Sequence, residues 1–332
     1  MNSSATLTQP GVVHYAEDPR LDQGTKAFLT MLNSAGGPPL ESLSPADARM
    51  VLVNAQTSMN VDLSGIEVSE KTISSDGYTV KLFIIRPEGV KEVLPVFMFL
   101  HGGGWVLGDF PTHKRMVRDL VVLSGYCAVF VEYTRSPEAR YPQALHEIYA
   151  ATKWVAQNGA EIGVDGTTMA VVGNSAGGDL TAATCLMAKD KGGPDIKLQI
   201  LLWPVTNADF ELNSYEEFGE DRFLTTSVMK WMWDQYVPDL EQRKEKYASP
   251  LQATIEELRG LPPTLIQVAQ NDILRDEGEA YGRKLDLAGV PVTTIQYNGM
   301  IHDFGLLNGL AHLPATRSLF VHAAAELKKY LG

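Results

Sequence analysis

The sequence predicts an α/β fold, with a mostly parallel β-sheet covered by helices on both faces. From about residue 78 to the end of the chain, short apolar segments typical of strands alternate with amphipathic segments typical of helices. Strands connected through helices pair in parallel, and the helices then bury both faces of the sheet. The length of 332 residues and the hydrophobic content of 45% suit one large domain with a sizeable core.

The expected elements follow one another in a regular order. Residues 78–85 alternate between polar and apolar side chains and predict a strand, and residues 95–100 form a short apolar run of strand type. Thr112 can cap a helix that ends at Gly125. Pro142 suits the first turn of the next helix. Further strands are expected at 126–131, 169–172, 198–202, 264–268 and 292–297, and further helices at 176–189, 275–287 and 314–330.

Two segments interrupt this alternation and predict a split helical cap. Residues 1–60 contain two helical stretches before any strand, and residues 205–245 are an insert rich in aromatic side chains. An ordinary surface excursion is the alternative, but so long a loop usually has structure or function of its own. We therefore expect both segments to cover the C-terminal edge of the sheet, above a core formed by 61–204 and 246–332.

The acidic composition excludes two classes of partner. A net charge of −12 disfavours binding to nucleic acids and to anionic membranes. The first residues, MNSSATLTQP, lack the basic and apolar regions of a targeting signal. The uncharged stretch at 120–131 is only 12 residues long, too short to span a bilayer. We therefore expect a cytoplasmic protein with no nucleic-acid or membrane partner.

The two cysteines and the histidines show no metal-binding pattern. Cys127 and Cys185 lie far apart in apolar surroundings, as expected of buried free thiols. The chain contains no H-E-x-x-H motif and no zinc-type spacing of cysteine and histidine. No metal and no organic cofactor is therefore expected.

The strongest indication of chemistry is the G-x-S-x-G segment centred on Ser175. It directly follows the strand expected at 169–172 and begins the helix expected at 176–189. A serine on such a tight turn is exposed above the sheet, and its neighbours two residues away must be small. The N-terminus of the new helix also favours the negative charge that develops during acyl transfer. We interpret Ser175 as a nucleophile rather than as part of an incidental glycine-rich turn.

A second glycine-rich segment, His101-Gly102-Gly103-Gly104-Trp105, follows the strand at 95–100. Its backbone N–H groups are uncovered, so those of Gly103 and Gly104, with that of Ala176, would form an oxyanion hole. A phosphate-binding loop would require glycine where Leu107 stands. His101 precedes the glycines at a strand end, where a structural hydrogen bond is expected.

A serine hydroxyl needs a general base, and His302 is the candidate. In α/β-hydrolases the base follows the last strand, and the acid follows the strand before it. Among seven histidines, His302 lies five residues beyond the strand expected at 292–297. His312 and His322 lie in or beside the final helix and are interpreted as surface or packing residues.

Three carboxylates follow the strand expected at 264–268. Asp272 lies in the loop at the strand end, whereas Asp276 and Glu277 fall in the first turn of the next helix. Acidic residues are common in a first turn because they interact favourably with the helix dipole. Asp272 is therefore expected to hold one tautomer of His302 and to stabilise the imidazolium.

Together these segments resemble the hormone-sensitive-lipase-like family of α/β-hydrolases, which are bacterial carboxylesterases with a split helical cap. The resemblance extends from about residue 80 to the end of the chain. It rests on the H-G-G-G-x and G-x-S-x-G motifs, on the segment 132–142, on 272–277, which is similar to D-x-L-R-D-E, and on 302–304, which is similar to H-G/D-F. The resemblance implies short- to medium-chain esterase activity and a homodimer formed through the sheet edge.

The chain departs from the family pattern at two places. Asn174 stands where many members carry aspartate or threonine, and a side chain that cannot ionise supplies no charge there. Arg135 and Ser136 replace the usual leucine–alanine pair, which bears on substrate preference rather than on mechanism.

The predicted activity is a two-step acyl transfer on a small carboxylic ester. Ser175 attacks the carbonyl while His302 takes its proton, and water later releases the acyl group. Aromatic side chains of the cap are expected to form a bounded apolar pocket, although they can instead pack inside the cap. The candidates for substrate binding are Trp105, Phe210, Tyr215 and Trp231.

Three alternatives use the same fold. An amidase, lactonase or carbamate hydrolase would share the same residues, and the sequence does not separate these activities from an esterase. A non-enzymatic small-molecule receptor, or an interaction module with an inactive site, is disfavoured because such relatives typically lose the histidine that is present here as His302.

Overall fold

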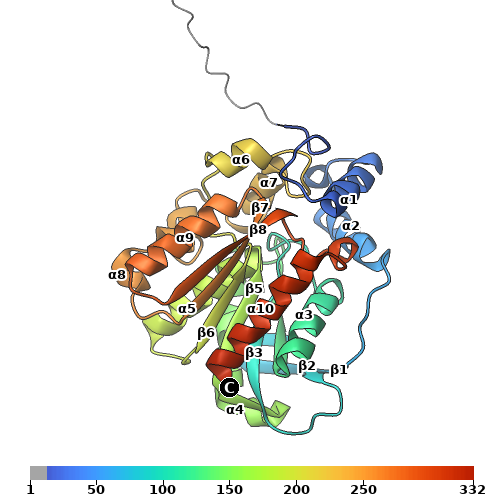
Figure 1. The fold of residues 1–332 in the computed structure, drawn as a ribbon. Helices are drawn as coiled ribbons and strands as arrows, with labels where there is room; N and C mark the ends of the chain where they lie inside the picture. The colour runs from blue at the N-terminus through green and yellow to red at the C-terminus, as the bar shows by residue number, and fades with distance from the viewer. Residues whose placement is uncertain (1–12) are drawn as a thin grey trace, which may run out of the picture.

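The structure is a computed structural model, and residues 13–332 are described. The N-terminal segment in which no targeting signal was expected, and the first part of the predicted cap, lie outside the described residues. Within 13–332 the strands form one sheet of eight, in the order β1-β2-β4-β3-β5-β6-β7-β8 (Figure 1). β2 is antiparallel to both neighbours, and all other pairs are parallel.

Seven of the eight described strands overlap predicted segments, and most of these seven have longer ends than predicted. Their bounds are β1 Ile66–Ser75, β2 Tyr78–Pro87, β3 Leu94–Leu100, β4 Cys127–Glu132, β5 Val164–Asn174, β6 Leu198–Leu202, β7 Thr264–Asn271 and β8 Val292–Ile301. β1 was not predicted, because only Ile73 of this edge strand is buried and its other side chains are mostly exposed and polar. Without an apolar period, sequence patterning does not reveal such a strand.

Helices cover both faces of the sheet, as expected for parallel strands. Their bounds are α1 Gln23–Ser34, α2 Pro45–Thr57, α3 Phe110–Ser124, α4 Gln143–Asn158, α5 Ala176–Lys191, α6 Asn213–Phe218, α7 Thr226–Tyr236, α8 Ile255–Leu258, α9 Arg275–Leu287 and α10 Pro314–Leu331. The described 3-10 turns are 40–42, 159–162, 242–244, 250–252 and 308–310. α3 and α10 pack on one face of the sheet, and α4, α5 and α9 on the other.

The two faces are built by the alternation of side chains along each strand. In β3, Phe97 and Phe99 point into the cluster under α3 and α10, whereas Val96, Met98 and Leu100 point into the cluster under α4 and α5. All five side chains are fully buried. The continuous apolar run at 95–100 is therefore explained by burial on both faces.

Two element boundaries differ from the sequence expectation. α3 begins at Phe110, because Asp109 is the N-cap and Thr112 occupies the third helical position of a capping box. Thr112 is thus part of the cap motif without being the N-cap itself. β8 continues to Ile301, so His302 follows the strand directly and not after a five-residue loop. Gly125 ends α3 in the left-handed conformation, as predicted.

The N-terminal helices and the insert lie at the same end of the molecule. Figure 1 shows α1, α2, α6 and α7 at the end of the sheet where the parallel strands terminate. The insert at 205–245, which we call the cap insert, folds into α6 and α7. Asn33 of α1 donates a hydrogen bond to the carbonyl of Asp221 in this insert, at 3.2 Å. The two segments therefore lie side by side above the sheet.

Among residues 13–332, no helix is long and apolar enough to cross a membrane. The same residues contain no group of three or more histidine, cysteine or acidic side chains arranged to hold a metal ion. Cys127 and Cys185 are buried free thiols, as predicted. Burial raises the pKa of the Cys127 thiol to about 12.

Candidate active site

Ser175 occupies the single position between β5 and α5. Its backbone has φ 54° and ψ −122°, a conformation that non-glycine residues rarely adopt. A Cβ atom at Gly173 would lie 2.1 Å from the carbonyl oxygen of Gly177, and one at Gly177 would lie 2.0 Å from that of Leu100. Both glycines are therefore required by close backbone packing, and the turn holds Ser175 at the end of the sheet.

His302 connects the serine to a carboxylate. Its Nε2 lies 2.9 Å from Ser175 Oγ, and its Nδ1 lies 2.8 Å from Asp272 Oδ2. The backbone N–H of Leu274 donates to Asp272 Oδ1 at 3.0 Å. Ser175, Asp272 and His302 are only 4%, 2% and 2% exposed. The structure thus brings together the three residues expected to act as nucleophile, acid and base.

The electrostatics of His302 suit a general base. Burial alone would lower its pKa, but the carboxylates of Asp272 and Asp303 outweigh burial and raise the pKa above its ordinary value. The hydrogen bond to Asp272 acts in the same direction. Since Asp272 contacts Nδ1, the neutral imidazole carries its proton there and leaves Nε2 free to accept the serine proton.

The remaining histidines considered from the sequence have other surroundings. His101 is fully buried, with its Nδ1 2.9 Å from the carbonyl oxygen of Gly102 and its ring stacked on Tyr133 at 4.1 Å. Burial holds the pKa of His101 well below its ordinary value, so the ring is neutral. His312 is exposed and His322 is half-buried. His101 therefore has the structural hydrogen bond expected from its position.

The glycine loop after β3 lies against the nucleophile turn. Gly103 and Gly104 have φ angles of 104° and 58°, which favour glycine. A Cβ atom at Gly102 would lie 3.0 Å from that of Ser175, so the loop and the serine are in contact. Among the described residues, the N–H groups of Gly103 and Gly104 have no hydrogen-bond partner in this loop. Ala176 is the first residue of α5, where the N–H group has no acceptor within the helix.

Asn174 links the glycine loop to the residue after His302. The N–H of Gly102 donates to Asn174 Oδ1 at 3.0 Å, and Asn174 Nδ2 donates to Asp303 Oδ1 at 3.1 Å. The indole N–H of Trp203 donates to the same oxygen of Asp303 at 2.6 Å. The other oxygen of Asp303 lies 3.8 Å from His302 Nε2. Asp303 is thus a second carboxylate at the site. From the sequence it was expected only as part of the segment that is similar to H-G/D-F.

The two carboxylates that follow Asp272 have partners outside the triad. Asp276 accepts a hydrogen bond from the N–H of Ser214 in the cap insert, at 2.9 Å. Glu277 is fully buried and accepts the N–H groups of Thr206 and Asn207 at 2.7 and 3.2 Å. Asp276 and Glu277 therefore have structural hydrogen bonds in addition to a favourable interaction with the helix dipole. Of the three carboxylates after β7, Asp272 is the one that contacts His302.

The four predicted substrate-binding residues differ in burial. Trp105 is fully buried and stacks on Tyr236 at 4.4 Å, and the hydroxyl of the buried Tyr215 lies 3.4 Å from Glu277. Phe210 and Trp231 are only partly buried. Contact of these four residues with a substrate stays a prediction.

Met232 of α7 is a residue near the site that the sequence analysis did not single out. A Cβ atom at Gly104 would lie 1.9 Å from its sulfur, so Met232 packs directly on the glycine loop. An apolar residue within an amphipathic helix has no local signal that identifies it as a neighbour of the site. This contact places the cap insert above the glycine loop.

A family model described as alpha/beta hydrolase fold matches residues 97–306. The match covers more than half of the chain, and it includes the glycine loop, the nucleophile turn and His302. The chain belongs to the α/β-hydrolase family. The family expected from the sequence motifs is thereby confirmed.

Several proteins that are similar to this α/β-hydrolase over two thirds of its length or more are named esterases. A thermostable esterase from Pseudomonas putida ECU1011 is 58% identical, with a TM-score of 0.94, and the match covers 95% of this chain and 99% of that one. Carboxylesterase NlhH of Mycobacterium tuberculosis is 33% identical over 98% of this chain and 99% of its own length. Ethyl acetate hydrolase of Pseudomonas putida is 31% identical over 69% of this chain and 72% of its own length.

Proposed function

We propose that this α/β-hydrolase is a serine carboxylesterase that hydrolyses short- to medium-chain esters through an acyl-enzyme intermediate. The observation that carries the proposal is the contact series from Ser175 Oγ to His302 Nε2 at 2.9 Å and from His302 Nδ1 to Asp272 Oδ2 at 2.8 Å. A serine, an imidazole and a carboxylate in this arrangement activate the hydroxyl for attack on a carbonyl. Relatives at 33% and 58% identity that act on esters support this reaction class.

In the first step Ser175 attacks the ester carbonyl and His302 removes the hydroxyl proton through Nε2. Asp272 keeps the imidazole in the tautomer that can accept this proton and stabilises the imidazolium. His302 then gives the proton to the leaving alcohol, and an acyl ester remains on Ser175. A water molecule repeats the sequence, so that the carboxylic acid leaves and the serine is restored.

The N–H groups of Gly103, Gly104 and Ala176 are the proposed oxyanion hole. Those of Gly103 and Gly104 have no partner in their loop, and that of Ala176 lies at the N-terminus of a 16-residue helix. These dipoles are fixed before the reaction, because close packing holds both glycine segments in place. Fixed donors stabilise the negative oxygen of the tetrahedral intermediate without reorganisation.

The acyl-chain preference is attributed to the cap insert. Met232 covers the glycine loop, and the partly buried Phe210 and Trp231 lie in the same insert. Each methylene that is buried in an apolar pocket stabilises binding by about 0.8 kcal/mol until the pocket is filled. Activity is therefore expected to rise from acetyl to butanoyl or hexanoyl esters and to fall for dodecanoyl esters. The ethyl acetate hydrolase among the relatives supports small esters as the class.

Labelling and a substrate series test this function together. A fluorophosphonate should modify Ser175, and Ser175→Ala should lower kcat by roughly 10⁴- to 10⁶-fold without unfolding the protein. p-Nitrophenyl esters of increasing acyl length, beside matched amides and lactones, define the reaction class. A label on another serine, or retained activity in Ser175→Ala, would overturn the proposed nucleophile. Faster turnover of the amide or lactone would reassign the substrate class.

We further propose that the cap bounds the substrate pocket. The core would consist of residues 61–204 and 246–332, and the cap of residues 1–60 and 205–245. A homodimer formed through the sheet edge is expected from the family resemblance, and sedimentation analysis tests it. A cytoplasmic location follows from the sequence expectation, and cell fractionation tests it.

A further inference from the structure

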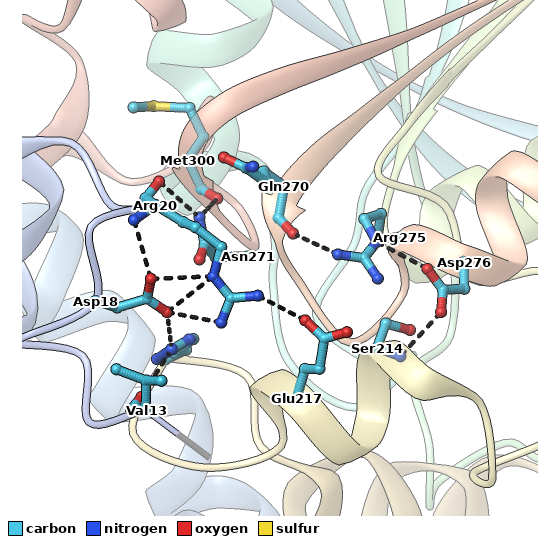
Figure 2. Close-up of polar contacts among 11 residues, drawn as sticks. Val13, Asp18, Arg20, Ser214, Glu217, Gln270, Asn271, Arg275, Asp276 and Met300 are labelled. Carbon is cyan, nitrogen blue, oxygen red and sulfur yellow. Dashed lines mark hydrogen bonds and ion pairs between the residues drawn. The ribbon is translucent and has the colours of Figure 1, made fainter. Parts of the chain in front are cut away.

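The loop that carries Asp272 is closed by Arg275. This loop runs from the end of β7 to the start of α9. The guanidinium Nη1 of Arg275 donates to the carbonyl oxygen of Gln270 at 3.2 Å (Figure 2), and the backbone N–H of Arg275 donates to the carbonyl of Asp272 at 3.1 Å. The side chain of Arg275 therefore binds the backbone two residues before the triad acid, and its backbone N–H binds the carbonyl of the acid itself.

The same guanidinium connects the loop to the cap insert. Arg275 Nε donates to Asp276 Oδ1 at 2.7 Å, and Asp276 Oδ2 accepts the N–H of Ser214 at the start of α6. The guanidinium also lies over the ring of Phe218, 5.0 Å from its centroid. Phe218 is fully buried at the end of α6. Arg275 thus contacts the end of this helix directly at Phe218, and it reaches the start of the helix through Asp276.

Two other arginines surround the same ring. Arg20 and Arg222 lie 4.9 and 5.3 Å from the centroid of Phe218. Both donate to the buried carboxylate of Asp18, and Arg20 also pairs with Glu217 at 2.6 Å. Each guanidinium therefore has a carboxylate partner, so the charges in this cluster are balanced. The N-terminal segment, the cap insert and the acid loop meet at one aromatic ring.

The far side of the acid loop is held by Asn271. Its side-chain N–H₂ lies 3.4 Å from the carbonyl oxygens of both Arg20 and Met300 (Figure 2). Met300 belongs to β8, two residues before His302. The acid loop is therefore fixed on one side to β8, the strand directly before His302, and on the other side to the cap through Arg275.

We propose that Arg275 is a positioning residue for the triad acid, which holds the carboxylate of Asp272 in register with His302 and makes that register depend on the docked cap insert. The role rests on the proposed function, in which Asp272 orients His302. The carboxylate of Asp272 must meet one imidazole nitrogen at 2.8 Å, and small displacements of catalytic groups reduce rates strongly. Arginine is needed at this position because its planar guanidinium has several N–H donors, and because Gln270 and Asp276 lie on different sides of it.

The test compares Arg275→Met and Arg275→Lys with Arg283→Met. Arg283 is on the same helix, and its side chain is 66% exposed in a surface pair with Glu279. Arg275→Met should lower kcat about ten-fold with KM within two-fold, and the midpoint of the acidic limb of kcat/KM should shift to lower pH. The shift is expected because a displaced Asp272 raises the pKa of His302 less. Arg283→Met should match the wild type in both readouts.

Arg275→Lys keeps the charge and the apolar stem but has one ammonium for two acceptors. It should show the same two changes at about three-fold in kcat, and it decides the question if Arg275→Met does not fold. The proposal is wrong if the folded variants keep the wild-type kcat and pH midpoint and show only a lower Tm. Arg275 would then be a structural residue. Asp272→Asn, measured beside them, separates failure of the Arg275 proposal from failure of the proposed function. An active Asp272→Asn would overturn the proposed triad itself.

Discussion

Replacing Asn174 by aspartate would put two carboxylates side by side at the active site. The amide of Asn174 has one orientation, because the N–H of Gly102 must face its oxygen and the carboxylate of Asp303 must face its nitrogen. In Asn174→Asp an oxygen would replace that nitrogen, 3.1 Å from Asp303 Oδ1. The substitution keeps the shape of the side chain and changes a donor into a like charge.

The size of the effect follows from two competing costs. Two unit charges about 3–4 Å apart repel by about 4–5.5 kcal/mol at an effective dielectric constant of ~20. One bound proton removes this repulsion and lets the new aspartate donate to Asp303. Protonating a carboxyl of ordinary pKa ~3.9 costs about 4 kcal/mol at pH 7 and about 1.5 kcal/mol at pH 5, at 1.36 kcal/mol per pH unit. The protonated pair is thus favoured at both values.

The predicted signature is a pH-dependent loss of stability. Because the pair has a raised pKa in the folded state, the variant should lose stability relative to wild type as the pH rises. The free energy of unfolding should be lower than that of the wild type by about 4 kcal/mol at pH 7 but by only about 1.5 kcal/mol at pH 5. Aspartate at this position is therefore expected to destabilise this protein, because Asp303 lies beside it.

Urea unfolding of both proteins at pH 5 and pH 7 measures these differences. Asn54→Asp is the matched control, because Asn54 is exposed on α2, and its variant should show no pH-dependent difference from wild type. An equal loss of stability for Asn174→Asp at both pH values would refute the reasoning, since it would mean that no proton is shared with Asp303.

Three further predictions concern the reaction. Asp272→Asn should lower kcat by roughly 10⁴-fold, whereas Asp276→Asn should mainly lower Tm; the reverse ranking in steady-state assays would reassign the acid. For the wild type, kcat/KM should fall as the pH drops through a value above the ordinary ~6.5 of imidazole, because carboxylates raise the pKa of His302 despite burial. A profile flat from pH 5 upward excludes a histidine base. Trp231→Ala should move the optimal ester toward longer acyl chains, and an unchanged optimum in the ester series would place Trp231 outside the pocket.

The candidate nucleophile was predictable because its requirements are local. A serine between two close-packed glycines, at a change from strand to helix, needs only five consecutive residues to be recognised. Apolar periodicity located the parallel strands, and the order of these strands then indicated where Asp272 and His302 should lie. The structure places His302 beside Ser175, and Asp272 beside His302.

The neighbours of this centre could not be predicted in the same way. Asn174 and Asp303 are 129 residues apart, and Gln56 of α2 contacts the carbonyl of Leu306 across 250 residues. Which polar side chains meet over such separations depends on how elements pack, and no local pattern records it. The exposed edge strand β1 was missed for a related reason, because its polar residues lack an apolar period.

The sequence by itself determined the class of fold and the candidates for nucleophile and base, since backbone geometry and apolar periodicity are encoded within short segments. Only the tertiary structure decided what surrounds them: the Asn174–Asp303 contact, Met232 on the glycine loop, and the arginines around Phe218. These contacts join segments that are distant along the chain. They form because a buried polar group or an aromatic face must find a partner once packing removes water.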